Sequence, residues 1–203
     1  VINELQSFFG RLTYGYAGKY MATVNFRADG STKFGENNKY GYFPSVSLGW
    51  NVSEEDFMQN SPFNMLKLRT SWGRTGNQEI LPKQTQALFV SSTAGGQSYP
   101  LYPTGAYPSG IVYRRLANPD LQWESSEQID LGIDFALLGG ALSGTIDMFR
   151  KVSRDILLFL PPTDPIQPAS AYFKNVPDMT ITNQGIELDL EYRHTSKSGF
   201  NYN

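Results

Sequence analysis

The chain has 203 residues and a formal net charge of −2, from 17 basic and 19 acidic side chains. This near balance gives no reason to expect a nucleic-acid partner, and the absence of cysteine excludes disulfide scaffolds, zinc–cysteine sites and cysteine nucleophiles. The 12 Tyr, 13 Phe and 19 Gly favour strands joined by turns. No apolar run reaches the roughly 18 residues of a membrane helix. This criterion does not detect the strands of a membrane barrel, because they are apolar on one face only.

Alternation of apolar and polar residues with a period of two predicts strands along most of the chain. In the first half, strands are expected over residues 7–16, 20–29, 45–52 and 66–73. A short turn at 17–19 joins the first pair, and a polar loop at 30–39 follows the second strand. Pro44 is expected at a strand start or a bulge, because proline has no amide to donate to a ladder. Ser53 is expected to cap one or two helical turns that end before Pro62.

In the second half, strands are expected over 128–137, 142–148 and 186–193, with a tight turn at Gly139–Gly140. Residues 75–120 and the proline-rich residues 153–182 carry no clean alternation and are expected to be long loops. An incomplete further strand is expected after a turn at 195–199. No signal peptide is visible. A strand pattern begins almost at Val1, and another is just beginning where the chain stops, so we expect a piece of a longer protein.

The expected turns fall into two classes. Those after the first, third, fifth and seventh strands are short or hold one small helix, whereas the others are loops, two of them long. Because an antiparallel meander puts alternate turns at opposite ends of the sheet, one end is trimmed and the other elaborated. This asymmetry is typical of an outer-membrane barrel, with short periplasmic turns and longer extracellular loops. The alternative is an antiparallel sheet with one face on a soluble core, but strands of about ten residues exceed the usual length of about five or six.

Aromatic residues support the membrane interpretation. They lie near the short-turn end on the apolar face, where a girdle at the periplasmic interface would need them. These residues are Tyr16, Tyr20, Trp50 and Tyr192.

Several stretches of the sequence closely resemble the SusC/RagA family of TonB-linked outer-membrane proteins. They come in the family's order and cover most of the chain. The stretches are 26–35 (FRADGSTKFG), 40–50 (YGYFPSVSLGW), 68–78 (LRTSWGRTGNQ), 118–124 (NPDLQWE) and 183–187 (NQGIE). Together these matches are highly specific, although any one alone would not be.

The resemblance implies a place in the outer membrane of a Gram-negative bacterium, typically of the Bacteroidota, and an all-β fold that forms part of a 22-stranded transmembrane barrel. It also implies import of oligosaccharides or peptides with a SusD-like surface lipoprotein as the lid. Energy would come from the TonB complex, which would contact parts of the protein outside this chain. No stretch matches the plug domain, so residues 1–203 are expected to belong to the barrel alone. No cofactor is implied.

The alternation predicts which residues face lipid and which face the lumen. Apolar positions expected to face lipid include Val24, Phe26, Leu48, Leu131, Ile133, Ile146 and Leu188. Polar positions expected to face the lumen include Asn25, Arg27, Ser47, Asp130, Asp147 and Asp189. Leu131 and Asp130 on the same side of the sheet would contradict this prediction.

Charge is unevenly distributed along the polar face. The earlier strands are basic, through Arg11, Arg27, Lys67 and Arg69. The later strands are mostly acidic, through Asp130, Asp134, Asp147, Glu187, Asp189 and Glu191. Such a wall could orient a plug by complementary charge. Equally, Arg69 and the acids could pair between adjacent strands.

The candidate recognition residues are four tyrosines of the first long loop, namely Tyr99, Tyr102, Tyr107 and Tyr113. Their amphipathic rings suit stacking on sugars or packing against a peptide or lid protein, but a local cluster that holds the loop down is an equal alternative. No nucleophile, base and orienting group can be assembled around His194, the only histidine, so an enzyme is not expected. A soluble β-rich carbohydrate-binding module is the alternative function.

Overall fold

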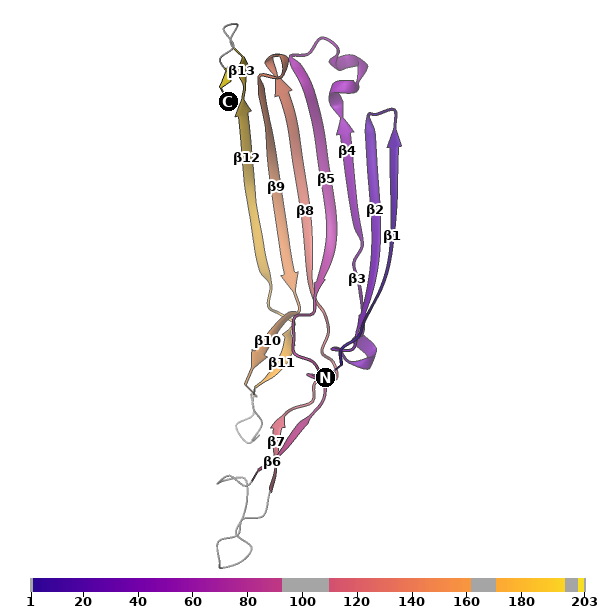
Figure 1. The fold of residues 1–203 in the computed structure, drawn as a ribbon, viewed down its shortest axis with the longest axis vertical. Coiled ribbons are helices and arrows are strands. Elements are labelled where there is room, and N and C mark those ends of the chain that lie inside the picture. The colour runs from indigo at the N-terminus through magenta and orange to yellow at the C-terminus, as the bar shows by residue number, and fades with distance from the viewer. Residues whose placement is uncertain (1, 93–109, 162–170, 196–200, 203) are drawn as a thin grey trace, which may run out of the picture.

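The structure is a computed structural model that describes residues 2–92, 110–161, 171–195 and 201–202. Its main element is an antiparallel sheet in the order β1-β2-β4-β5-β8-β9-β12, with β3 paired to β2 (Figure 1). The strands are β1 (Leu5–Tyr16), β2 (Tyr20–Ser31), β3 (Tyr40–Tyr42), β4 (Ser45–Asn51), β5 (Phe63–Asn77), β8 (Glu124–Leu137), β9 (Leu142–Arg154) and β12 (Ile181–Tyr192). Neighbours in space follow one another along the chain, so the fold is the all-β meander that the sequence predicts.

All seven expected strands are present, and most are longer than the alternation alone indicates. The expected interruption at Pro44 lies between β3 and β4, where the Pro44 carbonyl accepts a hydrogen bond from the Arg74 amide of β5. The expected helical turns after β4 are two short 3-10 helices, η2 (Val52–Glu54) and η3 (Asp56–Met58). The expectation that Ser53 caps them was wrong, because Ser53 lies inside η2 and Asn51 stands at its N-cap.

Both predicted long loops contain paired strands, which corrects the expectation that they lack regular structure. β5 continues to Asn77, and β6 (Leu88–Ser92) pairs with β7 (Gly110–Arg115) within 75–120. β10 (Ile156–Leu160) pairs with β11 (Tyr172–Val176) within 153–182. Both hairpins lie beyond the same end of the main sheet, below it in Figure 1. Their strands of five or six residues are too short for their alternation to stand out between the prolines and glycines around them.

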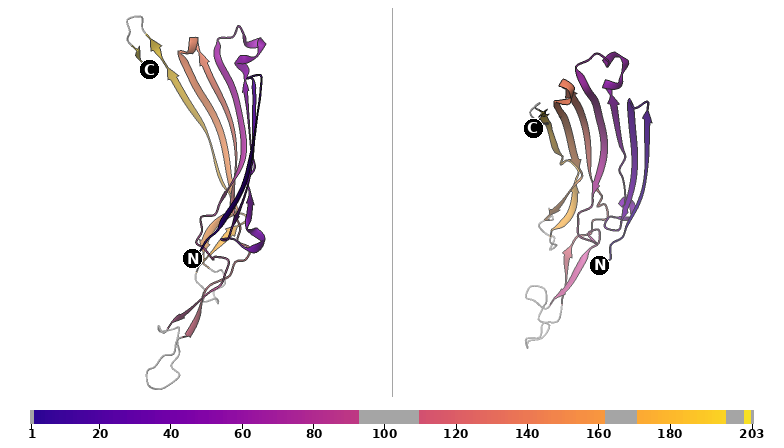
Figure 2. Two further views of the ribbon diagram at one scale, coloured as in Figure 1. Left: turned by 45° about the vertical axis from the view of Figure 1, so that its right-hand side comes forward. Right: turned by 45° about the horizontal axis from the view of Figure 1, so that its top comes forward.

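The turns at the other end of the sheet are compact. Residues 17–19 join β1 to β2 with Ala17 and Gly18 at positive φ, and η4 (Leu138–Gly140) joins β8 to β9. β13 (His194–Thr195) and β14 (Asn201–Tyr202) pair with each other beyond β12. The predicted asymmetry between a trimmed and an elaborated end is therefore present, and Figure 2 shows the curvature of the sheet between these ends.

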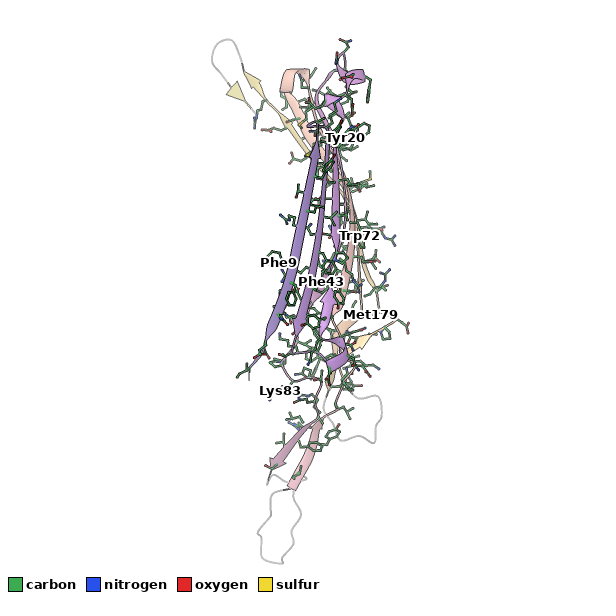
Figure 3. The ribbon with its side chains drawn as sticks, turned by 90° about the vertical axis from the view of Figure 1, so that its right-hand side faces the viewer. Phe9, Tyr20, Phe43, Trp72, Lys83 and Met179 are labelled. Atoms are coloured by element: carbon green, nitrogen blue, oxygen red, sulfur yellow. The ribbon has the colours of Figure 1, made fainter. Side chains whose placement is uncertain are left out.

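The register confirms that the two faces are distinct. Leu131 pairs with Thr70 and Met148, whereas Asp130 pairs with Ser71 and Phe149. Adjacent residues on a strand point to opposite faces and directly paired residues share a face, so Leu131 and Asp130 lie on opposite sides, as predicted. Figure 3 views the sheet from its β1 edge and shows side chains leaving both faces.

Buried hydrophobic residues lie mainly outside the regular sheet. A cluster at the elaborated end joins Phe34, Phe43, Ile80, Leu121 and Trp123, and we call these five residues the knot. Leu157 and Phe173 of the second hairpin pack against it. Among the described residues, no helix is long and apolar enough to cross a membrane.

Candidate functional site

The apolar face carries an exposed band of large side chains. Leu131 and Leu188, for example, are 53% and 63% exposed. At the trimmed end the band finishes in a row of paired residues, Tyr16, Tyr20 and Trp50, whose rings stack with centroids 6.5 and 6.3 Å apart. Tyr192 ends β12 at the same end. The expected aromatic row is thus assembled by the register, and its rings combine an apolar body with a polar tip.

The band also has a boundary at the elaborated end, which the sequence reading missed. The next positions on the same face are charged or polar on four consecutive strands, namely Arg74, Glu127, Arg150 and Gln184. Phe26 and Tyr42, on neighbouring strands, stack near this boundary with ring centroids 6.2 Å apart. On β8 the apolar positions run from Leu137 to Ile129, about 26 Å at the strand rise. The sequence signal for this boundary was that alternate positions along one face of each strand change from apolar to charged or polar residues.

The polar face is crossed by a bridge centred on Arg69 of β5. Its Nε and Nη2 donate to both carboxylate oxygens of Asp134 on β8, each at 2.8 Å, and Nη2 also donates to Asp147 on β9 at 3.0 Å. The guanidinium passes over Gly132, where an added Cβ would lie 2.4 Å from an Asp147 oxygen. We call this group the Arg69 clasp. It connects three adjacent strands.

The ten predicted charged residues share the polar face by strand parity and register. For Asp134 and Asp147, pairing with Arg69 is what the structure contains. Asp130 instead accepts hydrogen bonds from Ser71 at 2.8 Å and Gln128 at 2.7 Å.

The acids of β12 are arranged differently. Glu191 accepts from Arg193 at 2.7 Å, whereas Glu187 and Asp189 have no hydrogen-bond or ion-pair partner in the described part of the chain. The basic residues Arg11 and Arg27 have hydrogen-bond partners other than the six acids. Arg11 donates to Asn25 at 2.6 Å and Arg27 to Asp29 at 2.7 Å, and both lie on the first two strands, far from the clasp in strand order.

A polar latch joins two turns at the trimmed end. Glu55, between η2 and η3, accepts hydrogen bonds from the Tyr20 hydroxyl at 2.6 Å, Lys19 Nζ at 3.0 Å and Trp50 Nε1 at 3.1 Å. The hydrogen bond from Tyr20, followed by those from Lys19 and Trp50, lowers the Glu55 pKa to about 2. The hydrogen bond that Lys19 donates to Glu55 in turn raises the Lys19 pKa. The latch therefore holds a carboxylate and an ammonium in their charged forms.

The knot gathers residues from the stretches that carry the family resemblance. Trp123 packs against Phe34 and Phe43 with ring centroids 4.9 and 5.4 Å apart, and its Nε1 donates to the Lys39 carbonyl at 3.0 Å. At Gly35 an added Cβ would lie 1.8 Å from the Pro119 carbonyl oxygen, so only glycine fits this approach. Sequence reasoning identified these stretches but did not predict that they meet.

Hydrogen bonds tie the second hairpin to the knot. Asn118 Nδ2 donates to the Phe173 carbonyl at 2.9 Å, and the Asn175 side chain accepts from the Gln122 amide at 3.0 Å while donating to the Gln122 carbonyl at 2.9 Å. The hairpin is thus fixed to the segment that leads into β8.

Of the four predicted recognition tyrosines, only Tyr113 falls among the described residues. It lies on β7 and packs against Phe89 of β6, with ring centroids 4.9 Å apart. Tyr99, Tyr102 and Tyr107 lie outside the described residues. His194 begins β13. Within the described ranges, no group of three or more His, Cys, Asp or Glu residues could hold a metal ion.

Comparison with known proteins gives a consistent set of relatives. The sequence profile described as "TonB dependent receptor-like, beta-barrel" matches residues 2–203. TonB-dependent receptor P3 of Formosa agariphila is 36% identical over 202 residues, covering 98% of this chain and 19% of that protein. TonB-dependent receptor SusC of Bacteroides thetaiotaomicron is 35% identical over 156 residues, covering 76% of this chain and 15% of that protein. The chain thus spans about a fifth of the length of such relatives.

Solved structures agree. The RagAB peptide transporter superposes with a TM-score of 0.80 at 28% identity, over 98% of this chain and 21% of that one. The siderophore receptor PirA of Pseudomonas aeruginosa matches with a TM-score of 0.58 at 16% identity, over 93% of this chain and 31% of that one, a likeness of fold alone. The two-faced meander, its unequal ends and these matches identify the chain as a member of the TonB-dependent receptor β-barrel family, of the SusC/RagA type.

Proposed function

We propose that the chain forms part of the barrel wall of an outer-membrane importer that is driven by TonB and works with a SusD-like surface lipoprotein. The observation that carries this proposal is the two-faced sheet: a band of exposed apolar residues, bounded by aromatic and charged positions, backs a face of hydrogen-bonded charges. Such a sheet suits a wall between hydrocarbon and a polar lumen. The relatives are named as receptors rather than as enzymes.

The uncovered apolar face argues against a soluble carbohydrate-binding module. In the described ranges no second layer of the fold packs over the exposed side chains of Leu12, Val24, Leu48 and Leu188. Soluble proteins rarely leave contiguous apolar patches beyond a few hundred Å². Hydrocarbon would cover this surface, with the apolar band facing lipid and the polar face lining the lumen.

Cargo recognition is proposed at the elaborated end, which corresponds to the extracellular side in this arrangement. The two hairpins and the knot hold this end in a defined shape, and order before binding lowers the entropic cost of association. The cargo class is oligosaccharide or peptide, and the relative of known structure carries the name of a peptide transporter. The SusD-like lipoprotein would sit against the same loops as a lid.

The four tyrosines remain part of this proposal. Replacing Tyr99, Tyr102, Tyr107 and Tyr113 with alanine in the full-length receptor is expected to weaken cargo or lid binding while barrel assembly stays intact. Because Tyr113 packs on Phe89, the single variant Tyr113→Ala is the matched test of a local packing role. Unchanged affinity for both cargo and lid, at normal surface expression, would place recognition elsewhere.

Uptake by whole cells tests the function directly. The full-length receptor and its neighbouring lipoprotein, expressed in a strain that lacks its own importers of this type, should take up a labelled oligosaccharide or peptide only when TonB is present. Uptake that persists without TonB, or that never exceeds the empty strain for either cargo class, contradicts the proposal.

A second test concerns the isolated chain. The edge strands β1 and β12 each have one unpaired side among the described residues, and unpaired backbone groups in hydrocarbon cost several kcal/mol each. We therefore expect residues 1–203 alone neither to conduct ions in a planar bilayer nor to transport cargo. Conductance from the monomeric chain would contradict this.

A further inference from the structure

A hollow of about 850 Å³ lies over the first strands of the sheet, beside the knot. Its lining comes from β1, β2, the β3–β4 junction and β5, and the knot residues Phe43 and Trp123 close one side. The volume is within the range of small-molecule sites, about 300–1,000 Å³. Neither the charge pattern nor the long loops pointed to it in the sequence.

Cations dominate its border. The charged lining residues are Arg11, Arg27 and a single acid, Asp29, on the polar face, and Arg74, which belongs to the opposite face by strand parity. Arg11 and Arg27 both belong to the polar face and are diagonal neighbours on β1 and β2. Arg11 pairs with Asn25, and Arg27 lies two residues further along β2. This contrasts with the later strands, whose polar face carries the six predicted acids. The hollow therefore lies over the basic early strands of a face whose later strands carry mostly acids.

Both guanidiniums keep donors available. Arg11 uses Nε to reach Asn25 Oδ1 at 2.6 Å, and Asn25 in turn donates to Ser45 at 3.0 Å. Arg27 uses Nε to reach both oxygens of Asp29, at 2.9 and 2.7 Å. In the described part of the chain, no acceptor is bonded to the terminal nitrogens of either side chain. Their orientation is thus fixed by one nitrogen while the paired terminal donors stay open for a carboxylate or sulfate.

An aromatic ring stands next to these donors. Phe9 pairs directly with Arg27 across β1 and β2, so the two share the polar face, and Phe9 is 82% exposed. Figure 3 labels Phe9 and Phe43, which both line the hollow. The Phe9 ring stands on β1, the edge strand of the described sheet, and lines the hollow on its polar face. It suits contact with the apolar parts of an oligomer whose acidic groups bind the arginines.

We infer that this hollow is a cargo subsite that accepts an anionic group, a carboxylate or a sulfate, through Arg11 and Arg27, with Phe9 packing against the adjacent unit of the cargo. The inference rests on the proposed import function and adds a preference of charge to it. Its place beside the knot, at the end proposed to be extracellular, puts the subsite where cargo would enter the lumen. An acidic peptide and a uronic-acid oligosaccharide carry the required group equally.

The test measures binding to the full-length receptor together with its lipoprotein partner. Two matched probe pairs separate the possible sources: a penta-aspartate peptide with penta-asparagine, and a uronic-acid hexasaccharide with a neutral hexasaccharide. We expect the receptor to bind the acidic member of one pair more tightly than its neutral counterpart. Arg11→Gln should reduce that preference about tenfold, the effect of losing one charged hydrogen-bonding partner, and Arg11→Lys should restore part of it.

Control variants isolate the subsite. Lys67→Gln removes a cation from the same face outside the hollow and should leave the preference unchanged. Phe9→Ala should weaken the acidic and neutral probes of a pair alike. Arg27→Lys keeps the charge beside Asp29, which is only 7% exposed, and so avoids leaving a buried acid unpaired.

The outcomes for the subsite and for the import function are distinguishable. Equal binding within both pairs, no binding of any probe, or a charge preference that survives Arg11→Gln overturns the subsite, even if TonB-dependent uptake of another cargo continues. A preference that depends on Arg11, in a receptor whose uptake proves independent of TonB, supports the subsite and overturns the importer.

Discussion

The main sheet β1-β2-β4-β5-β8-β9-β12, which we call the wall, and the knot differ in how far they expose their apolar side chains. In the wall, outward residues such as Ile129, Leu131 and Leu188 are 51%, 53% and 63% exposed, and the strands are joined by ladder hydrogen bonds and polar-face contacts. In the knot, Leu121 is 0% exposed and Trp123 is 8% exposed. The knot therefore carries a core of its own, whereas the wall presents its apolar residues to its surroundings.

The two regions therefore gain their stability from different sources. Burial in the knot is complete within the chain, so its packing is expected to persist wherever the chain's fold persists. The wall gains the same transfer free energy only when hydrocarbon covers its apolar face. Substitutions in the two regions should consequently respond to different variables: cavity size in the knot, and depth and polarity in the wall.

The largest effect is expected from Trp123→Ala in the full-length receptor. The substitution removes two ring contacts and the hydrogen bond to Lys39, and large-to-small changes of this kind cost about 3–5 kcal/mol. Hydrogen exchange should show the loss as faster exchange of amides in 31–39, 118–123 and the hairpin strands β10 and β11. Amides of β8 and β9 should keep their protection.

The matched control is Ile129→Ala, an apolar truncation on β8 where the side chain is 51% exposed. It should cost less, because lipid can fill the space that the truncation leaves and no internal cavity forms, and it should leave the knot unaffected. If Trp123→Ala loosens the whole wall to the same extent as the knot, the two regions are one cooperative unit and the contrast drawn above is wrong.

A charge on the apolar face should come next. Ile133→Arg places a guanidinium in the middle of the apolar band on β8, and an arginine at the membrane midplane of a barrel costs about 2–4 kcal/mol. Ser47→Arg, on the polar face of β4, should be tolerated. Folding of both full-length variants into lipid vesicles, followed by denaturant titration, compares them. Equal destabilisation would contradict the assignment of the faces.

A smaller loss is expected from Gly132→Ala, which acts on the polar face alone. The new Cβ would lie 2.4 Å from Asp147 Oδ1 and 2.8 Å from Arg69 Cζ, so the Arg69 clasp has to open. Overpacking of this kind costs about 1–3 kcal/mol.

Gly49→Ala is the control for Gly132→Ala. It also lies on the polar face, but its added Cβ meets the flexible end of Met21 at 3.3 Å. Denaturant titration of the two variants in vesicles should separate them. A Gly132→Ala receptor as stable as Gly49→Ala would mean that the clasp adds nothing to the wall.

Sequence reasoning reached the wall and missed the knot for physical reasons. Alternation is a local signal, so the strands, their faces and the aromatic row ending in Trp50 followed from it. The knot depends on contacts between residues far apart, such as Phe34 with Trp123, which no local period reports. The basic hollow was missed similarly, because Phe9 and Arg27 become neighbours only through the register of β1 and β2.

The smallest effect is expected at the latch, which belongs to neither region and tests whether the trimmed end is held by charge. The Glu55 pKa is lowered from 4.5 to about 2 in the folded state, chiefly by the Tyr20 hydroxyl. A group with a lowered folded pKa stabilises the fold fully above its unfolded pKa and loses that contribution as pH falls through the folded value. The latch should therefore stay closed at pH 4.5 and open as pH approaches 2.

Trp50 reports this opening, because its indole Nε1 donates to Glu55. In the full-length receptor, Trp50 and the other tryptophans all contribute to the fluorescence, so Trp50→Phe supplies the baseline. The pH-dependent difference should have its midpoint near 2, and Glu55→Gln should abolish it, since glutamine does not titrate. Glu54→Gln, an exposed neighbour with no partner among the described residues, should leave the midpoint unchanged. A midpoint near 4.5 would show that Tyr20, Lys19 and Trp50 do not hold the carboxylate, and that the trimmed end is closed by its backbone turns alone.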